Sequence, residues 1–287
     1  MTITHSLKDL RQYHREASNF FAAELTMLKE VLPLITDEKQ AKISILLMSA
    51  GQTGAALLQL ASQTDVFTDE STMLARSFIE KLTNFCYLCV CDEQEYKRFL
   101  LHPIYKQYHL TGNINWEDNI ENYNAYIKEK ENEQKRLKQI PLVQEALALF
   151  SETKSNLNWT KKTISERIKA LQDWGKMLDV FFFINKDYLY SKASEALHGS
   201  LFGCGYELGF DHYKYNESDP EYIDKKLYRQ STSLLIHLGF LIHETFTVLQ
   251  YTNAITELWD YSYENRNNAF GLLYHVLEKK MPGKKKE

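Results

Sequence analysis

Three side chains that could do chemistry stand one helical turn apart in the stretch YSKASEALHGS, at positions 190–200. Tyr190, Ser194 and His198 offer a phenol, a hydroxyl and an imidazole, and Gly199 follows directly. Residues four apart lie on the same side of a helix, and a glycine commonly ends one. An imidazole titrates near neutral pH, so it can give or take a proton in catalysis. The spacing predicts a polar stripe at the carboxyl end of a helix over residues 174–198.

A second polar stripe lies about a hundred residues earlier, in ARSFIEKLTNFCYL. Arg76, Glu80, Asn84 and Tyr87 follow one another at spacings of four, four and three, on a helix whose other faces are apolar. Burying an isolated charge costs several kcal/mol or more, so these residues need polar partners. We expect the two stripes to face each other and to bring Arg76 and His198 together.

Two interpretations of this constellation stay open. In the catalytic one, His198 acts as general acid or base, Arg76 stabilises the charge that develops on a phosphorane, and Glu80 orients a proton. The substrate-binding residues would then be Asn84, Tyr87, Tyr190 and Ser194. In the structural one, the same side chains form a buried hydrogen-bond network that fixes how the two helices pack.

Other readings of these residues find less support. Glu195-x-x-His198 matches half of a carboxylate di-iron site, but the sequence has no second copy of that motif. Cys86-x-x-Cys89-x-Cys91 could bind zinc together with Cys204, but the spacing lies inside an apolar helix and favours small buried thiols. A triad of Ser194, His198 and Glu80 would put its nucleophile mid-helix rather than on a strained turn. We therefore predict no metal and no cofactor.

Three separated motifs resemble those of an uncharacterised bacterial all-helical family. They are Arg76-Ser77-x-x-Glu80, the segment WTKKTISER from Trp159 to Arg167, and the Tyr190, Ser194, His198, Gly199 and Ser200 pattern. The resemblance covers about residues 40–250. Members of that family look like distant relatives of the HEPN superfamily, which includes many RNases of bacterial defence and toxin systems. The resemblance implies RNA cleavage by analogy, and a dimer, since HEPN-type sites often form across two-fold interfaces.

The sequence departs from the HEPN nuclease pattern, in which four to six residues separate an arginine from a histidine. Arg98-x-x-x-His102 is one residue too short, and the interval from Arg229 to His237 is too long. A nuclease of this type would have to assemble its site from two helices, with Arg76 on one and His198 on the other.

Helical periodicity runs through most of the 287 residues, and only 11 glycines and 5 prolines interrupt it. We predict an all-α fold, a multi-helix bundle of about ten helices with a HEPN-like core. We expect the helix over residues 93–109 to be strained or broken at the His102–Pro103 step. The expected helices span about residues 5–34, 38–63, 68–91, 93–109, 117–139, 141–153, 160–171, 174–198, 221–252 and 254–280. One helical domain over 1–282 would contain an N-terminal helical pair (1–67), a motif-bearing core (68–252) and a C-terminal helix (254–282), followed by a basic tail at 283–287.

Composition limits the partners and the compartment. A net charge of −4 argues against a surface coated for nucleic acid, although a local basic groove for RNA fits it. Uninterrupted apolar runs such as VFFFI at 180–184 are shorter than the ~20 residues of a membrane helix. We expect a cytoplasmic protein that forms a homo-oligomer or binds a protein encoded nearby. If the polar stripes are structural, the binding surface would be residues 117–139 with the loop 203–220.

Overall fold

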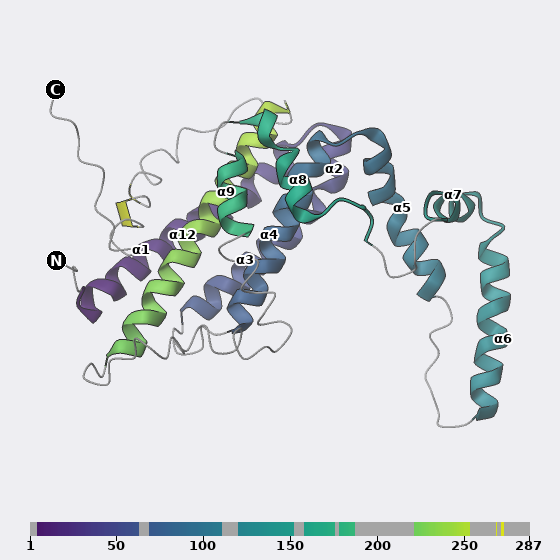
Figure 1. Ribbon diagram of the computed structural model, residues 1–287, viewed down its shortest axis with the longest axis horizontal. Helices are drawn as coiled ribbons and strands as arrows, with labels where there is room; N and C mark the ends of the chain where they lie inside the picture. The colour runs from purple at the N-terminus through teal and green to yellow at the C-terminus, as the bar shows by residue number, and fades with distance from the viewer. Residues whose placement is uncertain are drawn as a thin grey trace. The chain divides into compact units, whose positions relative to one another are not determined.

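The computed structural model describes residues 5–62, 69–110, 120–151, 158–175, 178–186, 221–252, 268 and 271–272. Over these residues the secondary structure is helical without a strand, which confirms the predicted all-α fold. The chain divides into two compact units, one of residues 1–90 and 164–287 and the other of residues 91–163. Figure 1 shows the elements of both. The single domain over residues 1–282 stays a prediction.

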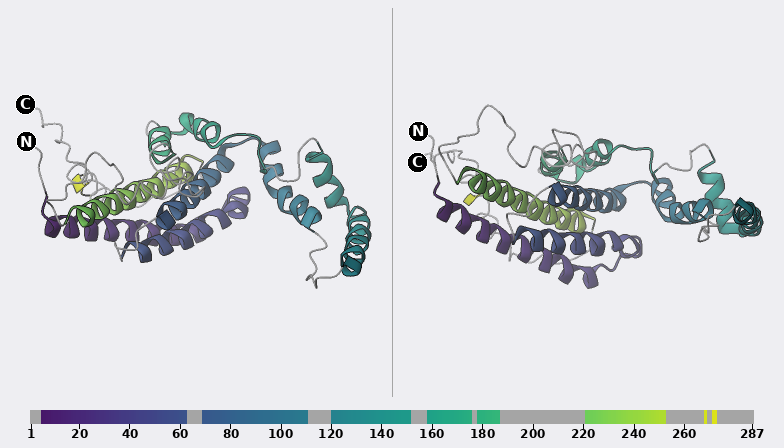
Figure 2. Two further views of the ribbon diagram at one scale, coloured as in Figure 1. Left: turned by 60° about the horizontal axis from the view of Figure 1, so that its bottom comes forward. Right: turned by 90° about the horizontal axis from the view of Figure 1, so that it is seen from below.

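Four long helices form the core of the first unit. They are α1 (Leu7–Val31), α3 (Ile45–Ala61), α4 (Asp69–Val90) and α12 (Tyr222–Tyr251). Helix α1 packs against α12 and α3, and α4 packs against α3 and α12, so that the four close one bundle. Figure 2 shows them side by side in two further views. The first and last of these helices therefore meet although almost two hundred residues separate them.

Local sequence sets the ends of these helices. Helix α1 begins with a capping box in which the Ser6 hydroxyl accepts from the Asp9 amide at 3.2 Å, and the Asp9 carboxylate accepts from the Ser6 amide at 3.1 Å. The helix predicted for residues 38–63 is divided in the structure. Helix α2 (Glu38–Ile43), capped by Asp37, ends at Ser44, and α3 begins directly after it. The Ser44 hydroxyl donates to the Ala41 carbonyl at 2.6 Å, which satisfies the backbone group that the break exposes.

Two glycines allow close packing in the bundle. A Cβ built on Gly54 of α3 would lie 2.4 Å from Leu25 Cδ2, and one on Gly239 of α12 would lie 2.4 Å from Phe20 Cε1. Both distances are shorter than two carbon atoms tolerate. Gly54 therefore lets α1 approach α3 closely, whereas a Cβ on Gly51 would have its nearest neighbour 4.0 Å away.

Shorter elements cover α4 and α12. Helix α8 (Ile164–Lys169) packs against α4, and α9 (Leu178–Ile184) packs against α12 and α8. A single 3₁₀ turn, Gln172–Trp174, joins the two. The helix predicted to begin near Thr160 starts four residues later, because the Thr160 hydroxyl accepts from the Lys162 amide and makes a local turn before α8.

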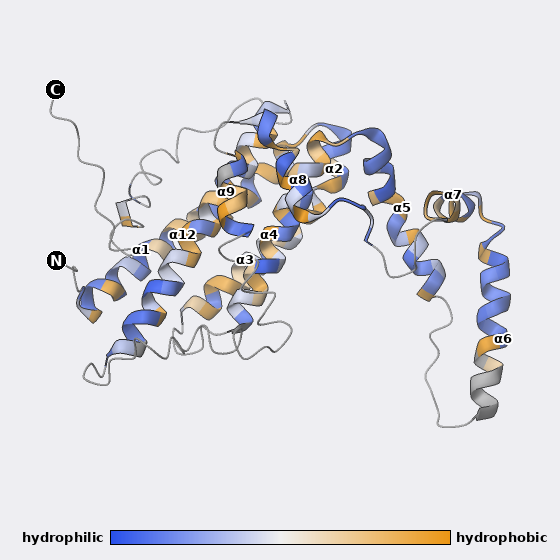
Figure 3. Cartoon of the chain, in the orientation of Figure 1, coloured by the Kyte–Doolittle hydropathy of each residue, from blue (hydrophilic) through white to orange (hydrophobic). Residues whose placement is uncertain are grey.

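The second unit contains α5 (Glu93–Leu110), α6 (Ile120–Leu137) and α7 (Pro141–Leu149). Helices α5 and α7 share a small core of Leu101, Tyr105, Ala146 and Phe150. The break expected at Pro103 does not occur, because α5 continues to Leu110. A proline removes only one backbone donor, and the turns on both sides keep theirs. For residues 117–139 the polar sequence allowed an exposed helix or an extended arm, and the structure has the helix α6, most of whose described part is hydrophilic, as Figure 3 shows.

Two stretches among the described residues are long and apolar enough to cross a membrane, judged by length and composition alone: Glu38–Ala61 and Asp224–Tyr251. The second is 94% buried in the bundle, as a core helix of a soluble protein would be, whereas the first is 33% buried. Neither stretch is an uninterrupted apolar run, because Ser, Thr, Gln and Gly stand among the apolar residues and the charged residues gather mainly near the amino-terminal ends.

Candidate functional site

The predicted stripe on α4 lies at the edge of the bundle rather than in its centre. Arg76, Glu80 and Asn84 are all half-buried, so that each side chain keeps some contact with solvent. Tyr87, at the end of the same stripe, is 1% exposed and belongs to the core. The apolar residues on the other faces of α4 are buried as expected, with Phe78, Leu82 and Phe85 fully inaccessible. The stripe therefore marks the boundary between core and surface.

A residue that the sequence analysis did not assign to the site meets this stripe. Arg167 of α8 donates a hydrogen bond from Nη1 to Oδ1 of Asn84. Its Nη2 lies 4.0 Å from Oε1 of Glu80, at the outer limit of an ion pair. Arg167 is 5% exposed, while the Glu80 side chain is 37% exposed. The site thus contains an arginine on each of two packed helices, with a carboxylate and an amide between them.

Helix α8 holds Arg167 against α4 through its apolar neighbours. Ile164 and Ile168 are both buried, and Arg167 lies three residues after the first and next to the second. It therefore shares the buried face of this short helix. A charged residue on an apolar face must find acceptors on the element that it packs against, and Asn84 and Glu80 are those acceptors. The segment WTKKTISER gives the spacing of Ile164 and Arg167, but the buried face becomes evident only from the packing of α8.

The other half of the predicted site lies outside the described residues. Tyr190, Ser194 and His198 fall in the interval 187–220, of which the structure describes nothing. The meeting of Arg76 with His198 stays a prediction. What the structure brings together is the first and second of the three motifs, through Glu80, Asn84 and Arg167.

The second motif begins at Trp159 in the other unit, where its first residue makes packing contacts and a backbone hydrogen bond. The Trp159 carbonyl accepts from Nε of Arg98 at 3.0 Å, and the Trp159 ring meets Phe99 edge-on at 5.3 Å between centroids. The Arg98 guanidinium also lies over the Phe150 ring, 4.6 Å from its centroid, and the His102 ring packs against Phe150 from 5.7 Å. Arg98 and His102, which nearly match the nuclease spacing, therefore pack around one aromatic ring.

Two further ionisable groups are buried inside the bundle. Nε2 of His14 on α1 lies 2.8 Å from the Ser231 hydroxyl on α12, and burial lowers the pKa of His14 to about 4. The Cys86 thiol on α4 lies 3.7 Å from the Thr245 hydroxyl on α12, and burial raises its pKa to about 12. Both groups are neutral at pH 7. Cys86 is thus the small buried thiol that its helical position predicted.

No cluster of three or more His, Cys, Asp or Glu side chains suited to a metal ion occurs in the described ranges. Of the residues considered for zinc, Cys86 packs in the core, and Cys204 lies in the interval without description. The half-motif Glu195-x-x-His198 lies in that interval too.

Comparison with protein families places these motifs in a known group. Residues 41–214 match the family described as "Family of unknown function (DUF5677)". The matched segment runs from α2 to α9 and includes all three motifs, whereas α1 and α12 lie outside it. Searches of curated proteins and of solved structures found no match. With the match covering more than half of its length, this helical chain belongs to the DUF5677 family of unknown function.

Proposed function

We propose that the protein is a metal-independent ribonuclease of the bacterial defence or toxin type, with its active site in a polar cleft beside α4. Arg76 holds the scissile phosphate, His198 transfers a proton, and Glu80 orients the group that exchanges it. Asn84, Tyr190 and Ser194 complete the surroundings of the substrate, while Tyr87, also expected there, is 1% exposed and supports the site from the core. The distant likeness of the motifs to HEPN proteins supports this assignment by analogy. A cytoplasmic location and a homo-oligomer or a partner protein encoded nearby are part of the same proposal.

The observation that carries the proposal is the position of the α4 stripe at the bundle surface. Arg76, Glu80 and Asn84 are half-buried, and the Glu80 side chain remains 37% exposed although a buried arginine lies next to it. A group in this position is held by the protein and still accessible to a ligand. Such partly desolvated charges interact more strongly with a phosphate than charges in open water do.

The chemistry requires little more than these groups. Attack of the ribose 2′-hydroxyl forms the 2′-O–P bond and breaks the P–O5′ bond. His198 would take the proton from the attacking hydroxyl and then give it to the leaving O5′, and Arg76 would stabilise the negative charge on the phosphorane between the two events. Arg167 serves as a positioning residue in this scheme, because its contacts with Asn84 and Glu80 fix the face of α4 that Arg76 shares.

A second function is favoured by the burial of Arg167. Arg167 is 5% exposed, and its guanidinium donates a hydrogen bond to Asn84. These contacts are typical of a residue that holds two helices together, here α4 and α8. If the whole network is of that kind, the protein is a non-catalytic interaction or sensor subunit. Its binding surface would then include the hydrophilic helix α6.

Cleavage of RNA by the purified protein in EDTA tests the first function. Wild type is compared with His198→Ala and Arg76→Lys, and with Arg136→Ala as a matched arginine control, since Arg136 is 77% exposed on α6 and pairs only with the nearby Glu133 in the described residues. We expect both site variants to keep the wild-type melting temperature and to lose at least ~100-fold in cleavage rate, in the range that general acid–base catalysis contributes. The control should cleave normally. Intact RNA with the wild type, together with a large loss of stability in His198→Ala, would establish the structural alternative.

A further inference from the structure

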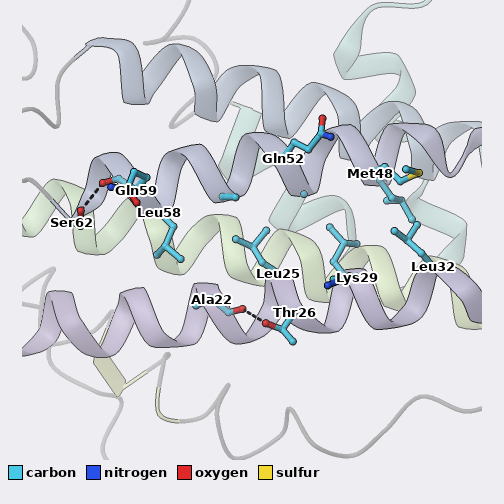
Figure 4. A pocket seen from close by; sticks show the side chains of 14 residues that line it. Ala22, Leu25, Thr26, Lys29, Leu32, Met48, Gln52, Leu58, Gln59 and Ser62 are labelled. Atoms are coloured by element: carbon cyan, nitrogen blue, oxygen red, sulfur yellow. Dashed lines mark hydrogen bonds between the residues drawn. The ribbon is translucent and has the colours of Figure 1, made fainter.

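An apolar groove runs between α1 and α3 on the outside of the bundle. It has a volume of about 740 Å³, and Figure 4 shows Leu25 of α1, Leu32 directly after the end of α1, and Met48 and Leu58 of α3 along it. Its lining shares no residue with the cluster on α4 and α8. Lys29 is the one charged residue among the described residues that line it.

Gly51 keeps the floor of this groove open. A Cβ on Gly51 would have Leu28 Cδ2 as its nearest neighbour, at 4.0 Å, whereas a Cβ on Gly54 in the next turn would overlap Leu25 at 2.4 Å. The missing side chain at position 54 therefore serves packing inside the bundle, and the missing side chain at position 51 leaves space that the bundle does not fill. A glycine inside a helix costs about 0.5–1 kcal/mol relative to alanine, so its position at an open groove is informative.

The exposed face of α3 is also unusual in its charge. The helix has no Asp, Glu, Lys or Arg in its 17 residues, yet Ile45 is 63% exposed and Met48 is 54% exposed. Solvent-facing sides of helices normally carry charged residues, as α1 does at Arg11 and Arg15. An uncharged helix that presents large apolar side chains is typical of a surface that another molecule covers.

We propose that this face, the α1/α3 groove, is the interface of a two-fold homodimer in which the α3 helices of two copies lie against each other. A two-fold interface places each patch on the same patch of the partner, so any charged residue near the axis meets its own like charge. Helix α3 carries no charged residue, so two α3 helices that meet at the axis avoid this repulsion, and the charge that lines the groove, Lys29, lies on α1 beside them. The exposed Met48 and Ile45 side chains of one copy would occupy the space that Gly51 leaves in the other.

The dimensions of the groove suit a dimer. Helix α3 has 17 residues, so at 1.5 Å per residue it is about 25 Å long, and two neighbouring helices are together about 20–24 Å wide. The footprint is then roughly 500–600 Å² per copy, or about 1,000–1,200 Å² in total, which reaches the lower bound for specific interfaces. A membrane surface suits the face less well, because α3 has no Lys or Arg to contact lipid head groups and exposes Gln52 and Gln59 instead.

Sedimentation equilibrium of the full-length protein tests the interface independently of any ribonuclease activity. We expect wild type to be a dimer at micromolar concentration. Met48→Glu places two like charges in one apolar interface and should weaken the dimer by at least ~100-fold. Gly51→Phe fills the groove without a clash inside the bundle and should have the same effect. Leu142→Glu, a matched charge at an exposed leucine of α7, should leave the dimer unchanged.

Three results would overturn the proposal. The first is a wild-type protein that stays monomeric at 50 times the concentration used in the assay. The second is a dimer that persists in both Met48→Glu and Gly51→Phe while each variant keeps its helical circular dichroism. The third is a monomer that co-sediments with phosphatidylcholine and phosphatidylglycerol vesicles and loses that binding in the same two variants, which would assign the face to a lipid surface.

Discussion

The contacts of Arg167 predict that Asn84 contributes more to stability than Glu80, although Glu80 carries the charge. The hydrogen bond from Arg167 to the Asn84 amide oxygen joins a charged donor to a half-buried acceptor, and such bonds contribute about 1.5–3 kcal/mol. The ion pair with Glu80 spans 4.0 Å and the Glu80 side chain is 37% exposed, so solvent screening limits the contribution of the pair to about 0–1 kcal/mol. Asn84→Ala should therefore destabilise the fold by ~2–3 kcal/mol and Glu80→Gln by less than ~1 kcal/mol.

Urea unfolding followed by circular dichroism measures both effects, and two further comparisons separate their causes. Asn84→Asp keeps an acceptor for Arg167 and should recover most of the stability that Asn84→Ala loses. In 0.5 M NaCl the small effect of Glu80→Gln should shrink, because salt screens exposed pairs, while the effect of Asn84→Ala should not change. In a double-mutant cycle with Arg167→Met, the coupling energy should be larger for Asn84 than for Glu80. An equal or larger loss in Glu80→Gln would refute this reasoning.

Three more predictions follow from the core. Gly51→Ala should stabilise the monomer by about 0.5–1 kcal/mol. Gly239→Ala should destabilise it by up to ~2 kcal/mol, because the new Cβ would overlap the Phe20 ring. Thermal melting measures both effects, and Phe20→Leu should restore part of the stability that Gly239→Ala loses. His14 has a pKa of about 4 in the folded protein and near 6.5 in the unfolded chain, so protonation favours the unfolded state as the pH falls between these values. From pH 7 to pH 5, the free energy of unfolding should therefore fall by ~2 kcal/mol more in wild type than in His14→Gln. Cys86, with a pKa of about 12, should resist alkylation at pH 8 until the protein unfolds, which mass spectrometry of the labelled peptides would show.

Much of the fold could be predicted because the helices have strong local signals. The capping box at Ser6, the apolar faces of α4 and the long apolar period of α12 each fix a helix from its own residues. The division between α2 and α3 could not be predicted in this way. It depends on one serine whose hydroxyl satisfies a backbone carbonyl, and the same residue is also compatible with an unbroken helix.

The candidate site was predicted in part. The need of the α4 stripe for polar partners could be predicted, because charges on an apolar helix need partners wherever the helix lies. Its position at the edge of the bundle was not predicted. Its described partner, Arg167, was missed because the periodicity of one helix does not reveal which other helix will face it. Six residues of α8 were too few to show an apolar face on their own, and only the packing of Ile164 and Ile168 against the bundle makes that face evident.

The pairing of α1 with α12 has a consequence for synthesis of the chain. His14 and Ser231 are 217 residues apart in sequence, and translation proceeds at roughly 5–20 residues per second. The amino-terminal helix therefore leaves the ribosome some 10–40 seconds before the segment that buries its apolar side. During that interval Phe20, which packs against Gly239 and Phe240 of α12, is exposed to chaperones and to other nascent chains. The yield of protein in cells should depend on how this first helix is protected while the rest of the chain is being made.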